Sequence, residues 1–336
     1  MDLGSRPLTR STRFNVQFRR YERNFVRPLQ TSYGSWATRD GLIIRLRDPS
    51  GRLGWGEVAP IPWFGTETLE QAIAFLRSLD GEISPEQLWQ IPDSLPCCQF
   101  AFESAVNALT SDREPEPITF APSTVATLLP AGDRVLQTWQ TAWQAGHRTF
   151  KWKIGVLPSR TEWGLLAQLL GQLPAEGRLR LDANGALTAE DCRGWLERCD
   201  AAGDRVEFLE QPLNSVAEMQ VIAPSFRTPI ALDESVTQFK HLQACIQGGW
   251  RGVFVLKPAI SGFPSRLKAT IQARRLDCVF SSVFESFVGQ TAALQLAAAV
   301  TPIAPSHPAR ALGFGVGAWL DPLPPRWLET LWNRRF

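Results

Sequence analysis

Ionisable side chains stand at the ends of five short apolar runs, and their types are those of a proton-transfer site. The runs TFKWKI, LRLDAN, VEFLEQP, PIALDES and VFVLKP carry, in this order, Lys153, Asp182, Glu210, Asp233 and Lys257. Successive members lie 23 to 29 residues apart, which is about one strand plus one helix. In a (β/α) barrel the carboxyl ends of the strands form one face, and active sites lie there. We therefore expect these side chains to converge.

Three of these side chains are carboxylates on consecutive runs. A single charge at a strand end is usually a solvated loop residue or a helix cap. Three carboxylates buried together without a cation would repel one another and raise one another's pKa. Oxygen ligands suit a hard divalent ion, so Asp182, Glu210 and Asp233 are predicted to bind Mg²⁺, with Mn²⁺ as a substitute. The chain has only three histidines and no HExxH pattern, which argues against a His-rich zinc site.

Lysine is rare in this chain. Only 5 of its 35 basic residues are lysines and the others are arginines. Lysine can lose its proton near neutral pH in a suitable environment, whereas arginine cannot. Lys151 and Lys153 alternate with Trp152 and so share one face of their strand, while Lys257 is expected to reach the metal from the far side of the barrel. We expect Lys151 to support Lys153 by keeping its pKa low through like-charge proximity. The two remaining lysines lie on predicted helices among polar residues and are expected to be solvated.

A lysine base beside a metal-bound carboxylate permits one class of reaction. The metal stabilises the negative charge that forms when the neighbouring α-carbon loses its proton. The residues therefore indicate proton abstraction α to a carboxylate. Racemisation, cycloisomerisation and loss of a leaving group all remain open as outcomes.

The elements that position these residues fall into two parts. RFNVQF, GLIIRL and GWGEVA, within residues 12 to 60, are typical of strands. Residues 67 to 80, with Thr66 as N-cap, and residues 97 to 110 have helical spacing. EPEP at 114–117 then interrupts the pattern.

After this break, strand-like runs beginning with ITFA alternate with helical stretches, about seven or eight times in roughly 200 residues. The prediction is an α/β fold: a (β/α)7β TIM-like barrel with an N-terminal α+β capping domain. We assign residues 1–115 to the capping domain, 116–325 to the barrel and 326–336 to a tail that packs back on the capping domain.

The combined motifs resemble a known family. KWK, LRLDAN, EQP, LDES and LKP together are similar to the muconate-lactonizing subgroup of the enolase superfamily. Within it, GWGEVAPIPWFGTETLEQA at 54–72 and SSVFES at 281–286 resemble the o-succinylbenzoate synthase family. The resemblance extends from about residue 12 to 320.

This resemblance implies roles for the residues. Lys153 would remove the α-proton of a cyclohexadiene carboxylate and then, as an ammonium group, assist departure of the hydroxyl on the same face. Lys257 would steady the enediolate from the other face. The product, 2-succinylbenzoate, would feed menaquinone or phylloquinone synthesis, and the protein would be a carbon–oxygen lyase.

Further positions are candidate substrate contacts, each with a structural alternative. Arg180 is equally well interpreted as an ion-pair partner inside the barrel, the serines as helix caps and Phe64 as a core residue. Turn-like stretches at 31–34 and 62–65 are expected to close over the barrel mouth. The candidates are Ser281, Ser282, Ser261, Gly262, Arg180, Asn184, Thr31 and Phe64.

Composition restricts the partners to small molecules. The formal net charge of +2 without a basic stripe argues against nucleic acid. No uncharged apolar stretch of about 18 residues is present, so no membrane span is expected. The first residues lack the apolar core of a signal peptide, and the six cysteines form no CxxC pair, so we expect a cytoplasmic protein with reduced thiols. The substrate is expected to be a small carboxylate; the sequence does not indicate an oligomeric state.

Four other interpretations compete with the synthase. An N-succinylamino acid racemase or a muconate cycloisomerase would use the same motifs. A dipeptide epimerase ranks lower because the segment PSHPARALGFG lacks paired acids for a substrate amine. A barrel without catalysis is disfavoured because it would not need these ionisable strand ends.

Overall fold

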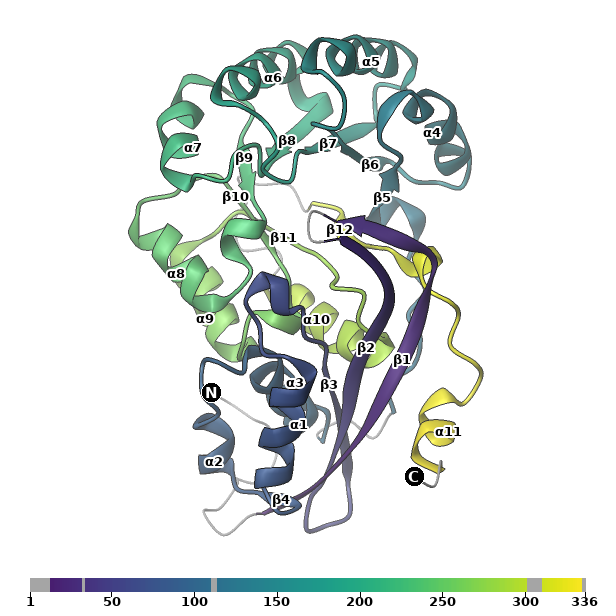
Figure 1. The fold of residues 1–336 in the computed structure, drawn as a ribbon, viewed down its shortest axis with the longest axis vertical. Coiled ribbons are helices and arrows are strands. Elements are labelled where there is room, and N and C mark those ends of the chain that lie inside the picture. Colours follow the sequence, from purple (N-terminus) through teal and green to yellow (C-terminus); the bar gives the residue numbers. More distant parts are fainter. Residues whose placement is uncertain (1–12, 32–33, 110–113, 301–309, 334–336) are drawn as a thin grey trace.

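The computed structural model of the chain describes residues 13–31, 34–109, 114–300 and 310–333. The first residues, in which we expected no signal segment, lie outside this part. The chain folds into an N-terminal α+β domain that packs beside a barrel (Figure 1). No helix among the described residues is both long and apolar enough to span a lipid bilayer.

The N-terminal domain is built on an antiparallel sheet in the order β3-β2-β1-β4. Its first two strands form a long hairpin that reaches toward the barrel (Figure 1), with a ladder that runs from Asn15↔Arg47 to Thr31↔Gly34. The elements of this domain are β1 (Phe14–Thr31), β2 (Gly34–Arg47), β3 (Leu53–Val58), α1 (Leu69–Ser78), β4 (Glu82–Ile83), α2 (Pro85–Trp89) and α3 (Pro96–Ala108).

Helix α3 lies directly on β3, at two glycines. A Cβ atom at Gly54 would stand 2.0 Å from the carbonyl oxygen of Ala105, and one at Gly56 would stand 2.0 Å from that of Ala101. Both distances are far shorter than any real contact, so only glycine allows the helix backbone to approach this closely. The contact makes β3 and α3 one tightly packed unit.

The predicted N-cap of α1 was wrong by two residues. Thr68, not Thr66, accepts a hydrogen bond from the Gln71 amide, and the Gln71 side chain accepts one from the Thr68 amide. This reciprocal pair is a capping box, which satisfies two otherwise unpaired amides. The Thr66 hydroxyl is buried in the preceding turn, where it accepts from the Ile61 amide.

The second part is a barrel of eight parallel strands in the order β11-β10-β9-β8-β7-β6-β5-β12. A bridge between Ser281 and Gly313 links its two edges. The strands are β5 (Val125–Leu129), β6 (Thr149–Lys153), β7 (Arg178–Asp182), β8 (Val206–Glu210), β9 (Ile230–Leu232), β10 (Val253–Leu256), β11 (Cys278–Phe280) and β12 (Leu312–Gly315).

Helices follow one another around the outside of these strands (Figure 1). They are α4 (Val135–Gln144), α5 (Ser159–Gln172), α6 (Ala189–Ala202), α7 (Val216–Ile222), α8 (Phe239–Gln247), α9 (Pro264–Arg274) and α10 (Phe287–Val300). The predicted (β/α)7β barrel with an α+β capping domain is confirmed.

One predicted strand was wrong. ITFA, residues 118–121, belongs to neither a helix nor a strand, and the first barrel strand is β5. Pro117 and Pro122 flank ITFA, and proline lacks the amide that a ladder needs. The Ile118 side chain is exposed, so its hydrophobicity does not reflect a place in the barrel.

The C-terminal helix α11 (Trp327–Asn333) lies beside β1 (Figure 1). Its Leu328 and Leu331 share a buried cluster with Tyr21, Ile43 and Trp55 of the sheet. The end of the chain therefore covers the face of the sheet opposite to α3.

Candidate active site

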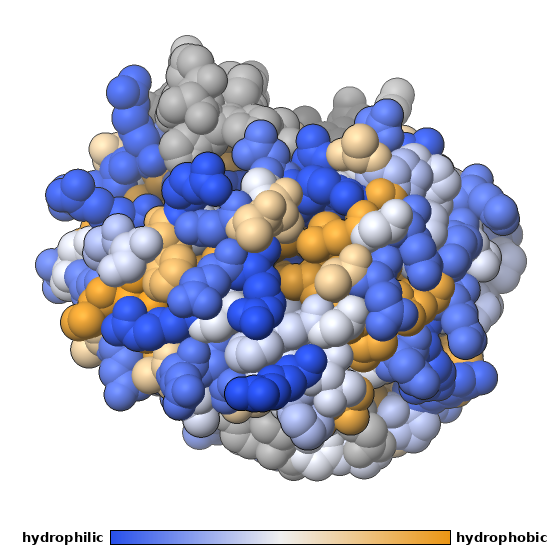
Figure 2. Space-filling view, turned by 90° about the horizontal axis from the view of Figure 1, so that it is seen from above, coloured by the Kyte–Doolittle hydropathy of each residue, from blue (hydrophilic) through white to orange (hydrophobic). Residues whose placement is uncertain are grey.

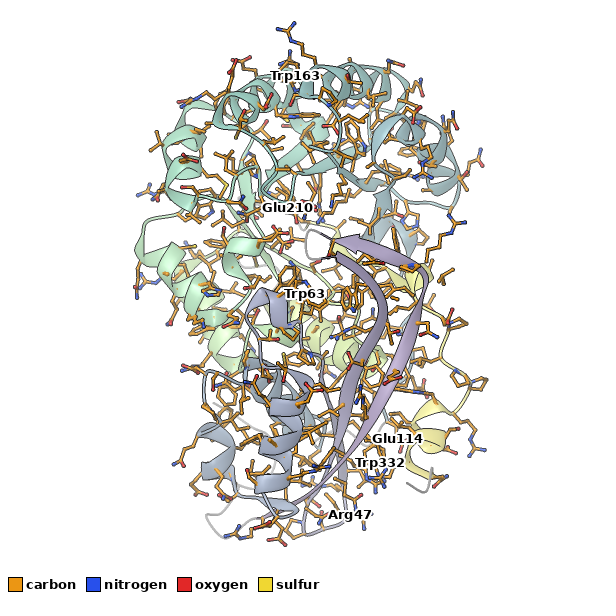
Figure 3. The ribbon with its side chains drawn as sticks, in the orientation of Figure 1. Arg47, Trp63, Glu114, Trp163, Glu210 and Trp332 are labelled. Carbon is orange, nitrogen blue, oxygen red and sulfur yellow. The ribbon has the colours of Figure 1, made fainter. Side chains whose placement is uncertain are left out.

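The strand register places the predicted residues side by side. Lys153 pairs with Asp182 across β6 and β7, and Asp182 pairs with Glu210 across β7 and β8. Asp233 directly follows β9, and Lys257 directly follows β10. Glu210 lies among these strand ends in the interior of the molecule (Figure 3). Parallel strands that end together thus bring five dispersed sequence positions to one mouth.

Lys151 bridges two of the carboxylates. Its Nζ atom lies 2.8 Å from Asp182 Oδ2 and 2.7 Å from Glu210 Oε1. Burial alone would lower the pKa of Lys151, but the two carboxylate charges outweigh burial and raise it. Lys151 therefore holds its proton and neutralises this part of the mouth.

Lys257 occupies a different environment. Its buried ammonium group forms an ion pair with Asp233, and Nζ lies 5.3 Å from the ring centre of Phe64. Burial lowers the pKa of Lys257 to about 7, and the charge of Lys151 adds to this. We expected Lys151 to exert its like-charge effect on Lys153; in the structure its charge lowers the pKa of Lys257.

Lys153 is exposed at the end of β6 and forms no ion pair with any other described residue. Trp152, between the two lysines, is fully buried and packs edge-on against Trp195 of α6. The alternation expected from the sequence is thus present: Trp152 faces the helices, and the two lysines face the mouth.

The three carboxylates have the chemistry of a hard-cation site, but each of them is paired with a lysine. Asp182, Glu210 and Asp233 are all buried. Burial, together with the charge of Asp182, raises the pKa of Glu210, and the charge of Lys151 opposes this shift. Within the described ranges, no three His, Cys, Asp or Glu side chains are grouped closely enough to hold a metal ion. The donor set fits Mg²⁺, whereas the side-chain arrangement is one of carboxylate–ammonium pairs.

Two polar residues beside the carboxylates were not singled out from the sequence. Gln211, which is buried, accepts hydrogen bonds from the amides of Asp233 and Ser235 and donates to the Leu213 carbonyl. Its φ of 35° lies in the left-handed region, where strain marks many functional sites. Gln211 therefore fixes the end of β9 to the end of β8. The position of Gln211 directly after the predicted ligand Glu210, in the motif EQP, was the sequence signal for this residue.

Glu234 is the other missed residue. The Asn184 side-chain amide donates to its Oε1 at 2.9 Å, and the Asn184 backbone amide donates to Asp182 Oδ1. Burial, with the charge of Asp182, raises the pKa of Glu234 to about 7. Asn184 thus lies between two carboxylates of the site, and its role as a substrate contact stays a prediction. The adjacency of Glu234 to Asp233 in LDES was the signal for a fourth carboxylate.

Of the two serines after β11, Ser282 bonds within its own segment and Ser281 bonds across the barrel seam. The Ser282 hydroxyl donates to Glu285 Oε2 at 2.7 Å and accepts from the Phe284 amide. The Ser281 hydroxyl donates weakly, at 3.4 Å, to the Gly313 carbonyl across the barrel seam. Burial raises the pKa of Glu285 to about 7. Both serines stand at the end of β11, next to the mouth.

The segment after β10 is shaped by the capping domain. The Ser261 hydroxyl donates to the Lys257 carbonyl. Gly262 has a φ of +91°, and a Cβ there would lie 2.7 Å from Gln99 Oε1 of α3. We expected Gly262 to admit a ligand; in the structure it admits the Gln99 side chain.

Arg180 lies in the barrel interior. Its Nε donates to Glu207 at 2.6 Å and its Nη2 to the Ala311 carbonyl at 2.7 Å. The ladder between β7 and β8 shifts by one residue after Leu179, and this shift places Glu207 between paired positions. Of the two interpretations, the structure places Arg180 in the interior ion pair, where it also ties β7 to the seam at β12.

The tip of the β1–β2 hairpin and the turn before α1 bring aromatic residues toward the mouth. Phe25, Trp36 and Phe284 pack with ring centres 4.9 to 5.7 Å apart, and Trp36 also packs on Trp63. Figure 3 shows Trp63 between the barrel and the capping helices. The Thr31 hydroxyl donates to the Gly34 carbonyl and closes the hairpin turn. Residues 32–33 of the predicted closing loop lie outside the described residues.

A hollow of about 560 Å³ lies elsewhere, on the outside of the barrel between α5 and α6. Trp163, at the top of Figure 3, lines it with Leu166, Leu170, Arg198 and Arg205. The view from above shows small groups of apolar residues between hydrophilic ones (Figure 2). The hollow contains none of the ionisable strand-end residues, so we place the site at the barrel mouth.

Two family models match the two parts of the chain. The one described as "MenC, N-terminal domain" matches residues 20–109, and "Enolase C-terminal domain-like" matches residues 134–312. The o-succinylbenzoate synthase of Thermosynechococcus vestitus is 37% identical over 310 residues, which are 90% of this chain and 92% of that protein. The chain belongs to the o-succinylbenzoate synthase family. It is therefore a lyase of the enolase superfamily.

A more distant relative and a solved structure are also similar to this chain, and both are o-succinylbenzoate synthases. The o-succinylbenzoate synthase of Escherichia coli K12 is 30% identical over 274 residues, or 79% of this chain and 81% of that protein. The crystal structure of the Thermosynechococcus elongatus BP-1 synthase, with magnesium in its active site, has a TM-score of 0.85 at 37% identity and covers 96% of this chain and 100% of that one.

A dipeptide epimerase of Methylococcus capsulatus has a TM-score of 0.72 at 21% identity and covers 86% of this chain and 88% of that one. At that identity the likeness shows a shared fold alone. The segment PSHPARALGFG, on which the ranking against epimerases depends, is described only from Arg310 onward.

Proposed function

We propose that the protein catalyses the Mg²⁺-dependent syn-dehydration of 2-succinyl-6-hydroxy-2,4-cyclohexadiene-1-carboxylate to 2-succinylbenzoate, a step toward menaquinone or phylloquinone. The observation that carries the proposal is the set of three lysines and three carboxylates at one barrel mouth, in a chain 37% identical to a named synthase.

Lys153 is the proposed base. It is the one of the three site lysines that forms no ion pair with a described residue, so its amine is available to a substrate. In the proposed step the α-carbon–hydrogen bond breaks and the proton moves to Lys153 Nζ. The carbon–oxygen bond to the hydroxyl then breaks, and the hydroxyl leaves with that proton as water. The ring becomes aromatic, which makes the elimination favourable.

Lys257 and Lys151 have supporting roles in the proposal. Lys257 approaches from the opposite side of the barrel and is backed by the Phe64 ring, so its charge stabilises the enediolate. Lys151 remains protonated between Asp182 and Glu210 and holds these two side chains in place.

The metal ligands in the proposal are Asp182, Glu210 and Asp233. Bound Mg²⁺ would supply positive charge beside the substrate carboxylate as the α-carbon loses its proton. For Asp233 to serve as a ligand, Lys257 must leave its ion pair with that carboxylate.

N-succinylamino acid racemase is the second candidate. A racemase needs an acid–base group on each face of the α-carbon. Burial lowers the pKa of Lys257 to about 7, so a second amine could exchange protons near neutral pH.

One assay separates the candidates. The purified protein is incubated with Mg²⁺ and either the cyclohexadiene substrate or an N-succinyl amino acid in D₂O. We expect rapid dehydration of the cyclohexadiene substrate. The α-proton of the N-succinyl amino acid should exchange at a much lower rate than that dehydration. EDTA should abolish turnover completely. Faster exchange than dehydration would support the racemase, and no turnover of either compound would refute both functions.

A further inference from the structure

Two carboxylates of the capping domain accept hydrogen bonds from the first turns of two helices that surround the barrel. These are Glu57 of β3 and Glu103 of α3, and both side chains are buried. The helices that they meet, α10 and α9, follow the strands that end next to Ser281 and Lys257. Neither residue touches the carboxylates of the mouth, so the proposed chemistry does not explain them.

Glu57 holds the start of α10 through several donors. The Ser286 amide lies 2.8 Å from Oε1, and the Gly289 amide lies 2.9 Å from Oε2. The hydroxyls of Ser286 and Tyr21 donate to the same carboxylate. An ionised carboxylate at a helix N-terminus accepts amides that have no partner within the helix and is favoured by the helix dipole. Glu57 is therefore an N-terminal cap that the other domain supplies.

Glu103 has the equivalent position at α9. Its two oxygens accept from the amide of Ser265, at 2.9 Å, and from the hydroxyl of the same residue, at 3.2 Å. Because α3 packs on β3 at Gly54 and Gly56, the two caps belong to one rigid unit. The packed unit of β3 and α3 thus binds the first turns of both helices.

Hydrogen bonds within residues 282–286 connect Glu57 with the barrel mouth. Ser286, which Glu57 holds, directly follows Glu285. The Glu285 carboxylate accepts from the Ser282 hydroxyl at 2.7 Å and from the Val283 amide at 2.6 Å. The Phe284 amide in turn donates to the Ser282 hydroxyl. Glu285 thus organises residues 282–284, and Glu57 holds the residue that follows it, while the Ser282 amide also donates to the Gly313 carbonyl across the barrel seam.

We propose that Glu57 is a positioning residue: by capping α10 from the other domain, it fixes residues 281–286 at the mouth, with the Ser281 and Ser282 hydroxyls and the Phe284 ring in their working places. Its effect on turnover rests on the proposed function, whereas its effect on the segment does not. A carboxylate that served only to hold the domains together would have no such local effect.

The test compares Glu57→Gln with a matched variant, Glu103→Gln. An amide keeps the size of the side chain but replaces one acceptor oxygen with a donor, so one of the bonded amides loses its partner. The readout is hydrogen–deuterium exchange of the whole folded chain, resolved by peptide. We expect Glu57→Gln to speed exchange about tenfold in residues 282–290. Glu103→Gln should speed it by a similar factor in 263–268 and leave 282–290 unchanged.

Substrate kinetics form the second arm. Because Ser281 and Ser282 of this segment are candidate substrate contacts and the segment carries no predicted metal ligand, Glu57→Gln should raise KM about fivefold or more with kcat within about twofold. Its Mg²⁺ affinity should equal that of the wild type. If Glu57→Gln does not fold, Ser286→Ala removes one donor from the same cap and should give the same pattern of exchange with a smaller change.

The outcomes separate the two proposals. Faster exchange spread evenly over the chain, or the same pattern in both variants, would overturn the positioning role even in an active enzyme. An inactive wild type would refute the proposed function, and the exchange pattern would still decide the role of Glu57. Faster exchange confined to residues 282–290 without a change in KM would also overturn the role. In that case the position of the segment would not affect substrate binding.

Discussion

At the scale of single residues, burial and neighbouring charge separate three lysines that look alike in the sequence. Two carboxylates hold the proton on Lys151, burial lowers the pKa of Lys257 to about 7, and Lys153 is exposed. The sequence predicted where these residues lie, because Lys153 and Lys257 stand at strand ends and Lys151 shares a strand face with Lys153. It could not predict their ion pairs, since each partner comes from another strand and a different part of the chain.

Arg180 provides a residue-scale prediction. In Arg180→Met, Glu207 loses its guanidinium partner inside the barrel. Breaking one side of a buried ion pair costs about 3–5 kcal/mol, so we expect the free energy of unfolding, measured in urea, to fall by that amount. The double variant Arg180→Met, Glu207→Leu should recover most of the loss.

The alternative for Arg180, a substrate contact, makes the opposite prediction. Unchanged stability together with a raised KM in Arg180→Met would contradict the interior role and support the substrate contact.

At the scale of elements, the tightest contact is that between β3 and α3. Gly56→Ala would place a methyl group 2.0 Å from the Ala101 carbonyl oxygen. Overpacking commonly costs about 1–3 kcal/mol, and a contact with rigid helix backbone should lie at or above the upper end. Chemical denaturation of the variant measures this cost.

Gly164→Ala is the matched control. Gly164 lies on α5, and no atom would stand within 4 Å of its new methyl group. Alanine is favoured over glycine in a helix by about 1 kcal/mol, so this variant should be slightly more stable than the wild type. Equal effects of the two substitutions would contradict the close approach of α3 to β3.

The alternation of strands and helices in the barrel was predictable because its strands are buried and its helices amphipathic. The errors fell where a local signal was ambiguous. ITFA has the hydrophobicity of a strand but lies between two prolines, and both Thr66 and Thr68 could have capped α1. Only the position of Gln71 three residues after Thr68 distinguishes them, through the capping box.

At the scale of the whole molecule, the two domains meet through buried carboxylates that local patterns do not reveal. Glu57 stands in an apolar strand and Glu103 in a helix that is buried over most of its length. Their partners are 229 and 162 residues away in the sequence. Neither spacing nor periodicity contains information about pairs at that distance, so the interface could be found only in the structure.

The pH dependence of stability follows from this interface. Burial raises the pKa of Glu103 from 4.5 to about 7. The folded chain therefore binds this proton more tightly than the unfolded chain does. The contribution of Glu103 to stability is complete below about pH 4.5 and is lost as the pH rises through 7.

Glu103→Gln removes this titration. The free energy of unfolding of the variant, relative to that of the wild type, should increase from pH 5 to pH 8. Urea denaturation at each pH measures this difference. Glu285 shifts in the same direction but is present in both proteins. A constant difference between the two proteins over this range would contradict the assignment.

In the proposed reaction, Lys153 removes the proton α to a carboxylate. The most direct measurement is the rate of 2-succinylbenzoate formation by Lys153→Arg, with Mg²⁺ and saturating substrate. Arginine keeps the positive charge, as it does at most basic positions of this chain, but it cannot accept a proton near neutral pH. We predict a loss of at least about 10²- to 10⁴-fold in kcat with Mg²⁺ binding unchanged. A kcat within about threefold of the wild type would contradict the account.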